Sequence, residues 1–484
     1  MRGLKAVENL LQYSLNHNLI EKWDIVLVRN QIYDLLGYMP DEIDDTLFQW
    51  TSAKKPKITT QNLPEILVDI TEEYIKRGHM PEDTAAARDL FETAVMGHVM
   101  PRQSEMIARF YINRSISKEA ATEDFYKLCR ASNYIRDSKE NMYWTAETEY
   151  GTIEISINLS HQEKDPKDIV AASLHSAASY PKCPLCLENV GFSGNRTWPA
   201  SQNLRIIPVT LDGIEWYFQY SPYSQYQEHF VVLNRDHKPM EITAATFRQL
   251  VDFVREFPHY FIGSNADLPI VGGSVLSHYH FQGGRHVFPI EKAKPFRHYS
   301  HKRYTDVDIS LVKWPLSVIR LSVAFDSIKT DLSEKKLAEK NLIKVASEIL
   351  SAWRKYSNGE IAAYTENVPH NTITPILRLK EGQLELDLIL RNNRTSEEHP
   401  DGIYHPHKER HHVKKENVEL EEVMGLAILP SRLKEEIETG KLSQDSITQT
   451  YIEILKDCGV FKDDPKGRED FDTFMTTGVG LTTI

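Results

Sequence analysis

The segment from residue 272 to residue 284 constrains the fold more than any other part of the chain, because its polar and aromatic side chains alternate. His278, His280 and Gln282 are separated by Tyr279 and Phe281. An alternation with a period of two is typical of a β-strand and predicts that the three polar side chains share one face. Two imidazoles and a carboxamide on one face are suited to binding and attacking a phosphate.

Glycine pairs flank this predicted strand. Gly272 and Gly273 precede it, and Gly283 and Gly284 follow Gln282. Because glycine has no Cβ, a ligand can approach the backbone closely there. A lone strand histidine is more often a hydrogen-bonded core residue, but two histidines and a glutamine between glycine pairs favour a catalytic site.

His280 is the expected nucleophile. A neutral imidazole attacks phosphorus when one ring nitrogen is held as a donor and the other is free. Attack on a nucleotide's α-phosphate gives a phosphoramidate, from which the nucleotidyl group can pass to a second phosphate. Gln282 can donate to a phosphate oxygen but cannot transfer a proton, which favours transfer between phosphates over hydrolysis.

Cys183 and Cys186 are separated by two residues, a spacing that presents two thiolates to one tetrahedral zinc ion. The other two cysteines of the chain are isolated in sequence. Histidines would therefore have to complete the site, and the best candidates are His237 and His278. Zinc held in this way would be structural; a redox pair and two ordinary buried thiols are the alternatives.

Composition excludes several classes of protein. The chain has 484 residues, with 57 basic and 69 acidic side chains and a net charge of −12, so a nucleic-acid-binding surface is not expected. We expect no signal peptide and no membrane span, and we find no phosphate-binding loop or dinucleotide fingerprint. Four cysteines form no disulfide framework, which favours a reduced, cytoplasmic enzyme.

The predicted elements indicate an α+β fold. Residues 1–150 are expected to be helical, with clear helices at 85–96 and 117–135. A first series then follows: a strand at 153–157, a hairpin over 204–220 that turns at Asp212-Gly213, a strand at 228–234 and a helix at 243–257. It ends with the histidine strand.

A second series of strand, helix and strand pair follows at 314–323, 333–356, 373–379 and 384–390, and its last two strands are expected to form a hairpin that turns at Glu381-Gly382. It lacks the alternating histidines, so we expect a duplicated unit of which only the first copy is catalytic. The expected domains are a helical region at 1–150, a catalytic unit at 151–300, a second unit at 301–435 and a helical tail at 436–484.

Taken together, these motifs resemble the galactose-1-phosphate uridylyltransferase family, in the transferase branch of the histidine-triad superfamily. The segment 180–189 and the helical N-terminus are similar to its class II form from Gram-positive bacteria. The resemblance implies two histidine-triad-like half-barrel units of antiparallel sheet with flanking helices. It also implies transfer of UMP from UDP-glucose to galactose 1-phosphate, through a uridylylated histidine, in the Leloir pathway. Class I members form homodimers.

By motif position the resemblance makes His280 the uridylylated residue and Gln282 its phosphate-stabilising partner. It implies zinc ligands at Cys183, Cys186, His237 and His278. Contacts to the nucleotide phosphates are implied for Asn265, Gly273 and Ser274.

His405 and His407 lie where class I carries a His-x-His near a second metal, although histidines in so charged a loop are more often solvated. Class I also has proline and glycine where this chain has Tyr279 and Phe281. The residues after Gly425 differ as well, so no sugar contacts are carried over.

Three rival functions remain open at this point. The chain could be a nucleotide-sugar or dinucleotide phosphorylase using the same histidine. It could be a zinc-stabilised binding protein, or a nucleic-acid-processing member of the superfamily, although the acidic balance argues against the last.

Overall fold

The computed structural model describes residues 2–48, 61–136, 141–158, 180–195, 198–273, 275–325, 332–359 and 361–484. The chain forms two compact units. One comprises Met1–Arg136, Cys183–Pro208 and Tyr217–Ser224, and the other comprises Asp137–Lys182, Val209–Trp216 and Gln225–Ile484.

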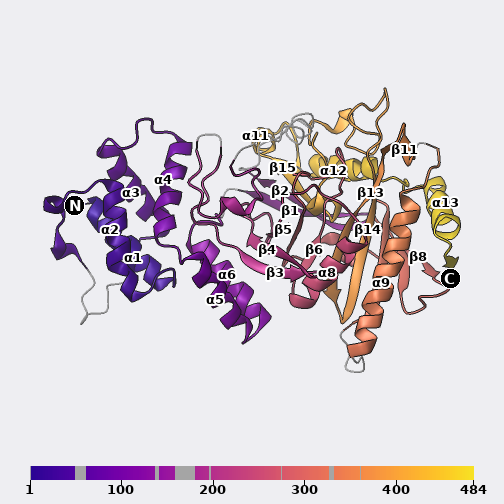
Figure 1. The fold of residues 1–484 in the computed structure, drawn as a ribbon. Coiled ribbons are helices and arrows are strands. Elements are labelled where there is room, and N and C mark those ends of the chain that lie inside the picture. The colour runs from indigo at the N-terminus through magenta and orange to yellow at the C-terminus, as the bar shows by residue number, and fades with distance from the viewer. Residues whose placement is uncertain are drawn as a thin grey trace. The chain divides into compact units, whose positions relative to one another are not determined.

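The N-terminal region is helical, as expected, and the predicted helices at 85–96 and 117–135 are confirmed by α4 and α6. Side chains of Asn62, Thr84 and Ser117 accept backbone N–H groups in the first turns of α3, α4 and α6, which fixes where these helices begin. The helices, coloured indigo to purple in Figure 1, are α1 (Arg2–Asn16), α2 (Ile25–Leu36), α3 (Leu63–Lys76), α4 (Ala85–His98), α5 (Gln103–Arg114) and α6 (Lys118–Ala131).

The large sheet has the strand order β16-β8-β9-β10-β14-β13-β6-β7-β5-β4-β3, and all neighbours from β16 to β5 run antiparallel. Its strands are β3 (Ile207–Leu211), β4 (Ile214–Tyr220), β5 (Phe230–Asn234), β6 (Phe261–Gly263), β7 (His280–Gly284), β8 (Pro295–Ser300), β9 (Asp308–Val312), β10 (Val318–Ala324), β13 (Asn371–Lys380), β14 (Gln383–Asn392) and β16 (Thr482–Thr483).

The same strand order occurs twice in this sheet. In the first repeat the chain runs β3, β4, β5, α8 (Ala244–Glu256), β6 and β7, and the sheet order is 3-4-5-7-6. In the second repeat it runs β8, β9, β10, α9 (Leu332–Trp353), β13 and β14, in the order 8-9-10-14-13. The two repeats meet where β6 pairs with β13. The expected recurrence of strand, helix and strand pair is therefore confirmed, although β10 begins at Val318 rather than near 314.

Both predicted hairpins are confirmed. Asp212 and Gly213 have φ values of 50° and 75°, and Glu381 and Gly382 have φ values of 50° and 78°. Two successive residues in the left-handed region form the tight turn whose twist matches that of paired strands. These turns fix the register of β3 with β4 and of β13 with β14.

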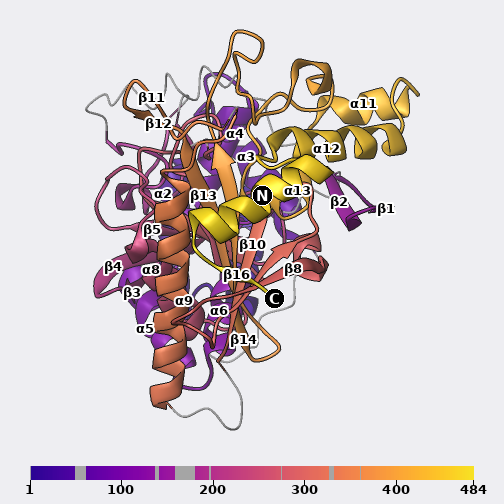
Figure 2. The same ribbon diagram turned by 90° about the vertical axis from the view of Figure 1, so that its right-hand side faces the viewer.

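The two faces of the sheet differ in character. Residues directly opposite each other on antiparallel strands point to the same side. One face is apolar and is covered by α8 and α9 (Figure 2), which both contact β13. Phe253 of α8 lies 5.0 Å from Phe230 between ring centroids. On the other face Gln282 is aligned through Gly263 and Ile376 with Asp387 and Arg320. Polar side chains therefore occur on this face in both repeats.

A second sheet contributes apolar side chains to a core on the face of the large sheet that also carries Gln282 and Asp387. It contains β1 (Met142–Thr148), β2 (Gly151–Asn158) and β15 (Leu426–Pro430), with β15 parallel to β2. The alternating Ile153, Ile155 and Ile157 of β2 are fully buried in a core that includes Ile376 and Ile389 of the large sheet. The prediction that residues 1–150 are helical is wrong from 142 onward, because β1 pairs with β2 in a hairpin.

The C-terminal tail is helical, as expected, with α11 (Arg432–Glu438), α12 (Gln444–Cys458) and α13 (Pro465–Thr473). Its last residues differ from the prediction, because β16 pairs with β8 at the edge of the large sheet. None of the described helices combines the length and the apolar character that crossing a bilayer requires.

Candidate active site

His280 occupies the first position of β7. It is buried, and its Nδ1 lies 2.8 Å from the carbonyl oxygen of His278. A carbonyl oxygen can only accept a hydrogen bond, so Nδ1 carries the proton and Nε2 keeps its lone pair. Burial lowers the pKa of His280 to about 4, which keeps the ring neutral. The residue thus has the form that nucleophilic attack requires.

The predicted strand is confirmed over His280 and Gln282 but begins at His280 rather than at His278. His278 lies in the bend before the strand, where its Nε2 donates to the carbonyl oxygen of Asn234 at 2.8 Å. The two histidines thus have different surroundings, and only the second shares the strand face with Gln282.

Tyr279 and Phe281 anchor β7 from its opposite, apolar face. Phe281 stacks on Trp216 with 4.9 Å between ring centroids, and the Tyr279 hydroxyl donates to Gln249 Oε1 at 3.1 Å and lies 2.7 Å from Thr246 Oγ1. The two aromatic residues that depart from the class I pattern therefore hold the strand, as the alternation predicted.

Gln282 is oriented by a residue that sequence reasoning missed. His229 Nε2 lies 3.1 Å from Gln282 Oε1, and His229 is buried. Because an amide oxygen can only accept, His229 is the donor. No motif marked His229; the only sequence signal was a polar residue at the start of an otherwise apolar strand.

Asn265 and Gly273, two predicted phosphate contacts, lie against each other. A Cβ on Gly273 would come within 2.5 Å of Asn265 Nδ2, so only glycine fits. Asn265 Oδ1 accepts from the backbone of Leu420 at 2.9 Å, and its buried Nδ2 has no hydrogen-bond partner within the described residues. A buried amide donor without a partner is suited to an anionic ligand. Ser274 lies outside the residues that the structure describes.

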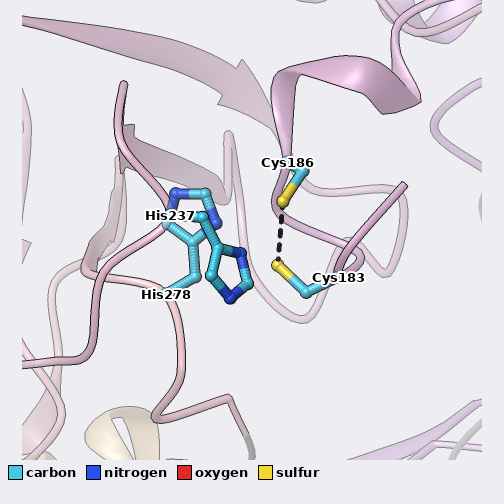
Figure 3. A group of neighbouring side chains, drawn as sticks. All are labelled: Cys183, Cys186, His237 and His278. Carbon is cyan, nitrogen blue, oxygen red and sulfur yellow. Dashed lines mark hydrogen bonds between the residues drawn. The ribbon is translucent and has the colours of Figure 1, made fainter. Parts of the chain in front are cut away.

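Four predicted metal ligands form one group: Cys183, Cys186, His237 and His278 each offer a ligand atom, and these atoms lie within 4.8 Å of one another (Figure 3). The two sulfur atoms are 3.5 Å apart, and the Asn189 side chain donates to both cysteine carbonyl oxygens at 2.8 Å. This group is a candidate metal site.

The protonation of the candidate ligands agrees with metal binding. Hydrogen bonding to Cys186 and burial raise the pKa of Cys183, so this thiol needs a nearby cation to ionise at neutral pH. His278 uses Nε2 as a donor, which leaves Nδ1 as its ligand atom. The backbone carbonyl of the same residue accepts from His280, so a metal here would fix the segment that orients the nucleophile.

The prediction that His405 is solvated is wrong. It is buried, and its Nε2 lies 3.2 Å from Asn417 Oδ1, because the loop folds back over this residue. His407 stacks on His399 with 4.2 Å between ring centroids. Among the described residues neither histidine belongs to a metal-type group, since the one found is the Cys-Cys-His-His group.

Two family models match this chain. Residues 33–239 match the model described as "Galactose-1-phosphate uridyl transferase, N-terminal domain", and residues 253–450 match the corresponding C-terminal domain. The second match shows that the family pattern extends over the second repeat of the sheet.

Full-length relatives agree with these matches. A galactose-1-phosphate uridylyltransferase of Bacillus subtilis (strain 168) is 46% identical, and the alignment covers 98% of each chain. One from Caldanaerobacter subterraneus subsp. tengcongensis is 44% identical over 97% of each chain. One from Streptococcus pneumoniae serotype 4 is 40% identical over 98% of this chain and 99% of the relative.

Proposed function

This chain belongs to the galactose-1-phosphate uridylyltransferase family, and on that premise we propose that His280 is the residue that carries the uridylyl group. The activity is galactose-1-phosphate uridylyltransferase, a step of Leloir galactose metabolism. The observation that carries the proposal is the hydrogen bond from His280 Nδ1 to the carbonyl oxygen of His278, which leaves Nε2 unprotonated in a buried, neutral ring.

The reaction consists of two displacements. His280 Nε2 attacks the α-phosphorus of UDP-glucose, the bond to the bridging oxygen breaks, and glucose 1-phosphate leaves with that oxygen. A phosphate oxygen of galactose 1-phosphate then attacks the same phosphorus, the P–N bond breaks, and UDP-galactose forms. No proton has to move between the phosphates, since every attacking and leaving oxygen is anionic.

Three donors act on the phosphate in this proposal. Gln282 donates from its side-chain nitrogen to a non-bridging oxygen, and the glycine turn at Gly273 lets the phosphate come close to the backbone. Asn265 adds the amide donor that has no partner within the described residues. Ser274, next to Gly273 in the sequence, completes the proposed phosphate contacts.

We further propose that the candidate metal site binds zinc. Two thiolates and two imidazoles are a common structural zinc set, and zinc–sulfur bonds of about 2.3 Å place two sulfurs about 3.8 Å apart, close to the 3.5 Å between Cys183 and Cys186. Zinc would stabilise the segment before β7 and take no part in bond formation. Metal analysis should find about one zinc per chain, and Cys183→Ser should lower both the zinc content and the melting temperature.

The repeated strand order supports a finer view of the fold, in which each repeat is a histidine-triad-like half-barrel unit, residues 151–300 being catalytic and residues 301–435 not. The expected cytoplasmic location agrees with the need of Cys183 and Cys186 for reduced thiols.

Isotope exchange tests the two-step reaction. Labelled glucose 1-phosphate should exchange into UDP-glucose without any galactose 1-phosphate, because the first displacement is reversible and complete in itself. Overall transfer without this partial exchange would contradict the covalent intermediate. Faster cleavage of UDP-glucose by inorganic phosphate than by galactose 1-phosphate would instead favour a phosphorylase.

A further inference from the structure

We propose that His229 is a positioning residue, which holds the Gln282 carboxamide with its nitrogen toward the transferring phosphate. This inference rests on the proposed function, because it assigns the donor of that reaction an orienting partner. Among the described residues no hydrogen bond other than the one from His229 reaches the Gln282 side chain.

The direction of this hydrogen bond decides the orientation of the amide. Gln282 Oε1 accepts from His229 Nε2 at 3.1 Å, so the two N–H groups of Gln282 are directed elsewhere. Gln282 shares the strand face of His280, where the phosphate would bind. Rotation of the amide by half a turn would present its oxygen to the anionic phosphate oxygens and would repel them.

His229 is held in the state that this role requires. Burial lowers the pKa of His229 to about 4, so the ring carries one proton at physiological pH. Its Nδ1 is buried without a hydrogen-bond partner in the described part of the chain. The proton therefore lies on Nε2, where it meets the Gln282 oxygen.

An acidic group lies close to this hydrogen bond, since Glu421 Oε1 is 3.9 Å from His229 Nε2. An ionised carboxylate there would compete with Gln282 for the N–H of His229. Burial, together with the nearby Glu419, raises the pKa of Glu421 to about 8, so the group is mostly protonated at neutral pH. Glu421 is therefore a weaker competitor for the N–H group of His229.

The turn before β5 fixes the position of His229. Glu228 has a φ of 53°, which is unusual for a residue with a long side chain. The Tyr260 hydroxyl donates to the Glu228 carboxylate, and the Tyr226 ring lies 4.4 Å from that of His229. Backbone strain that several contacts maintain is typical of functional sites.

A double-mutant cycle tests the proposal. The measured quantity is the single-turnover rate of His280 uridylylation by UDP-glucose, in wild type, His229→Leu, Gln282→Ala and the double variant. His229→Leu should lower this rate roughly 10- to 100-fold with little change in the binding of UDP-glucose. The double variant should be no slower than Gln282→Ala alone, because His229 acts only through Gln282. Multiplying effects would overturn the proposal.

Two conservative variants distinguish a positioning role of His229 from a role in folding. His229→Gln places an amide nitrogen near the former Nε2 and should recover most of the rate. His229→Asn, equally polar, reaches only the Nδ1 position and should not. Equal rates in the two variants would overturn the proposal. Absence of an adduct in folded wild type would refute the proposed function itself, whereas wild-type labelling that His229→Leu leaves unchanged would refute only the role of His229.

Discussion

In the first repeat of the sheet the buried His280 and His229 are neutral at physiological pH, whereas the buried Arg320, Arg378 and Asp387 of the second repeat are ionised and paired. Burial lowers the pKa of His280 and of His229 to about 4. Burial alone would raise the pKa of Asp387, but Arg320 and Arg378 together lower it to about 2.

The difference shows that two repeats with the same strand order can have different roles, one catalytic and one structural. Arg320 donates twice to Asp387, at 2.7 and 2.9 Å, and Arg378 donates to the same carboxylate at 2.8 Å and to Glu385. These two arginines and two carboxylates thus neutralise one another. In the first repeat Asn265 keeps a buried amide nitrogen without a hydrogen-bond partner in the described residues, and His280 keeps a neutral ring with Nδ1 as its donor, so that repeat can bind a ligand. Function depends on these few side chains and not on the strand order.

The largest expected effect is on catalysis in the first repeat. His280→Ala should lower the rate of uridylyl transfer at least about 10⁴-fold, because no other group can form the intermediate, with little change in melting temperature. His301→Ala provides a matched control, since His301 is also buried but bonds to Glu348 in the second repeat. Its transfer rate should remain close to that of wild type.

The second prediction concerns the buried ion pairs that Asp387 forms with Arg320 and Arg378. Asp387→Ala leaves Arg320 and Arg378 buried without their shared carboxylate and should lower the free energy of unfolding by about 3–5 kcal/mol. Denaturant titration measures this loss. If the variant kept its stability but was no longer uridylylated by UDP-glucose, the assignment of the second repeat to a structural role would be wrong.

A smaller effect is expected at Gln282. Gln282→Ala removes a donor to the transition state and should lower the turnover number about 10²–10³-fold, while Michaelis constants change little. Steady-state kinetics with both substrates distinguishes the two parameters. A rise in the Michaelis constant alone would show that Gln282 serves ground-state binding.

The last prediction, whose effect is small near pH 5 and grows with pH, concerns the stability contributed by Glu421. Its folded pKa of about 8 lies above the unfolded value of about 4.3, so the folded state binds the extra proton between these values and becomes less stable as pH rises through them. Below about 4 the group makes no difference.

Glu421→Gln should remove this slope. Its gain in free energy of unfolding over wild type should therefore grow from about pH 4 to about pH 8 and then level off. The charged neighbours Glu419, Glu422 and Lys414 are unchanged in the variant, so they contribute to both curves. A gain that is independent of pH would mean that Glu421 is ionised in the folded state.

Patterns within short segments of the sequence predicted several elements of the fold and the site. Alternation located β7, the turn pairs Asp212-Gly213 and Glu381-Gly382 located both hairpins, and spacing located the Cys183 and Cys186 half-site. The recurrence of strand, helix and strand pair also predicted the repeat. Each of these patterns is formed by residues that are close together in the sequence or by the order of such segments, so a single sequence is enough to reveal it.

Features that depend on distant contacts could not be predicted. His229 meets Gln282 only because β5 and β7 pair, and Leu420 reaches Asn265 across 155 residues of chain. His405 is buried and hydrogen-bonds to Asn417, although the charged composition of its segment indicated solvent exposure. Strand β1 was assigned to the helical region, although its partner β2 was predicted as a strand; the third strand of their sheet, β15, follows much later in the chain.

The intact mass of the protein after incubation with UDP-glucose alone tests the central claim most directly. Wild type should gain the mass of one UMP, and galactose 1-phosphate should remove it, while folded His280→Ala should gain nothing. An unchanged mass in folded wild type, or an equal gain in His280→Ala, would contradict the assignment of His280 as the uridylylated residue.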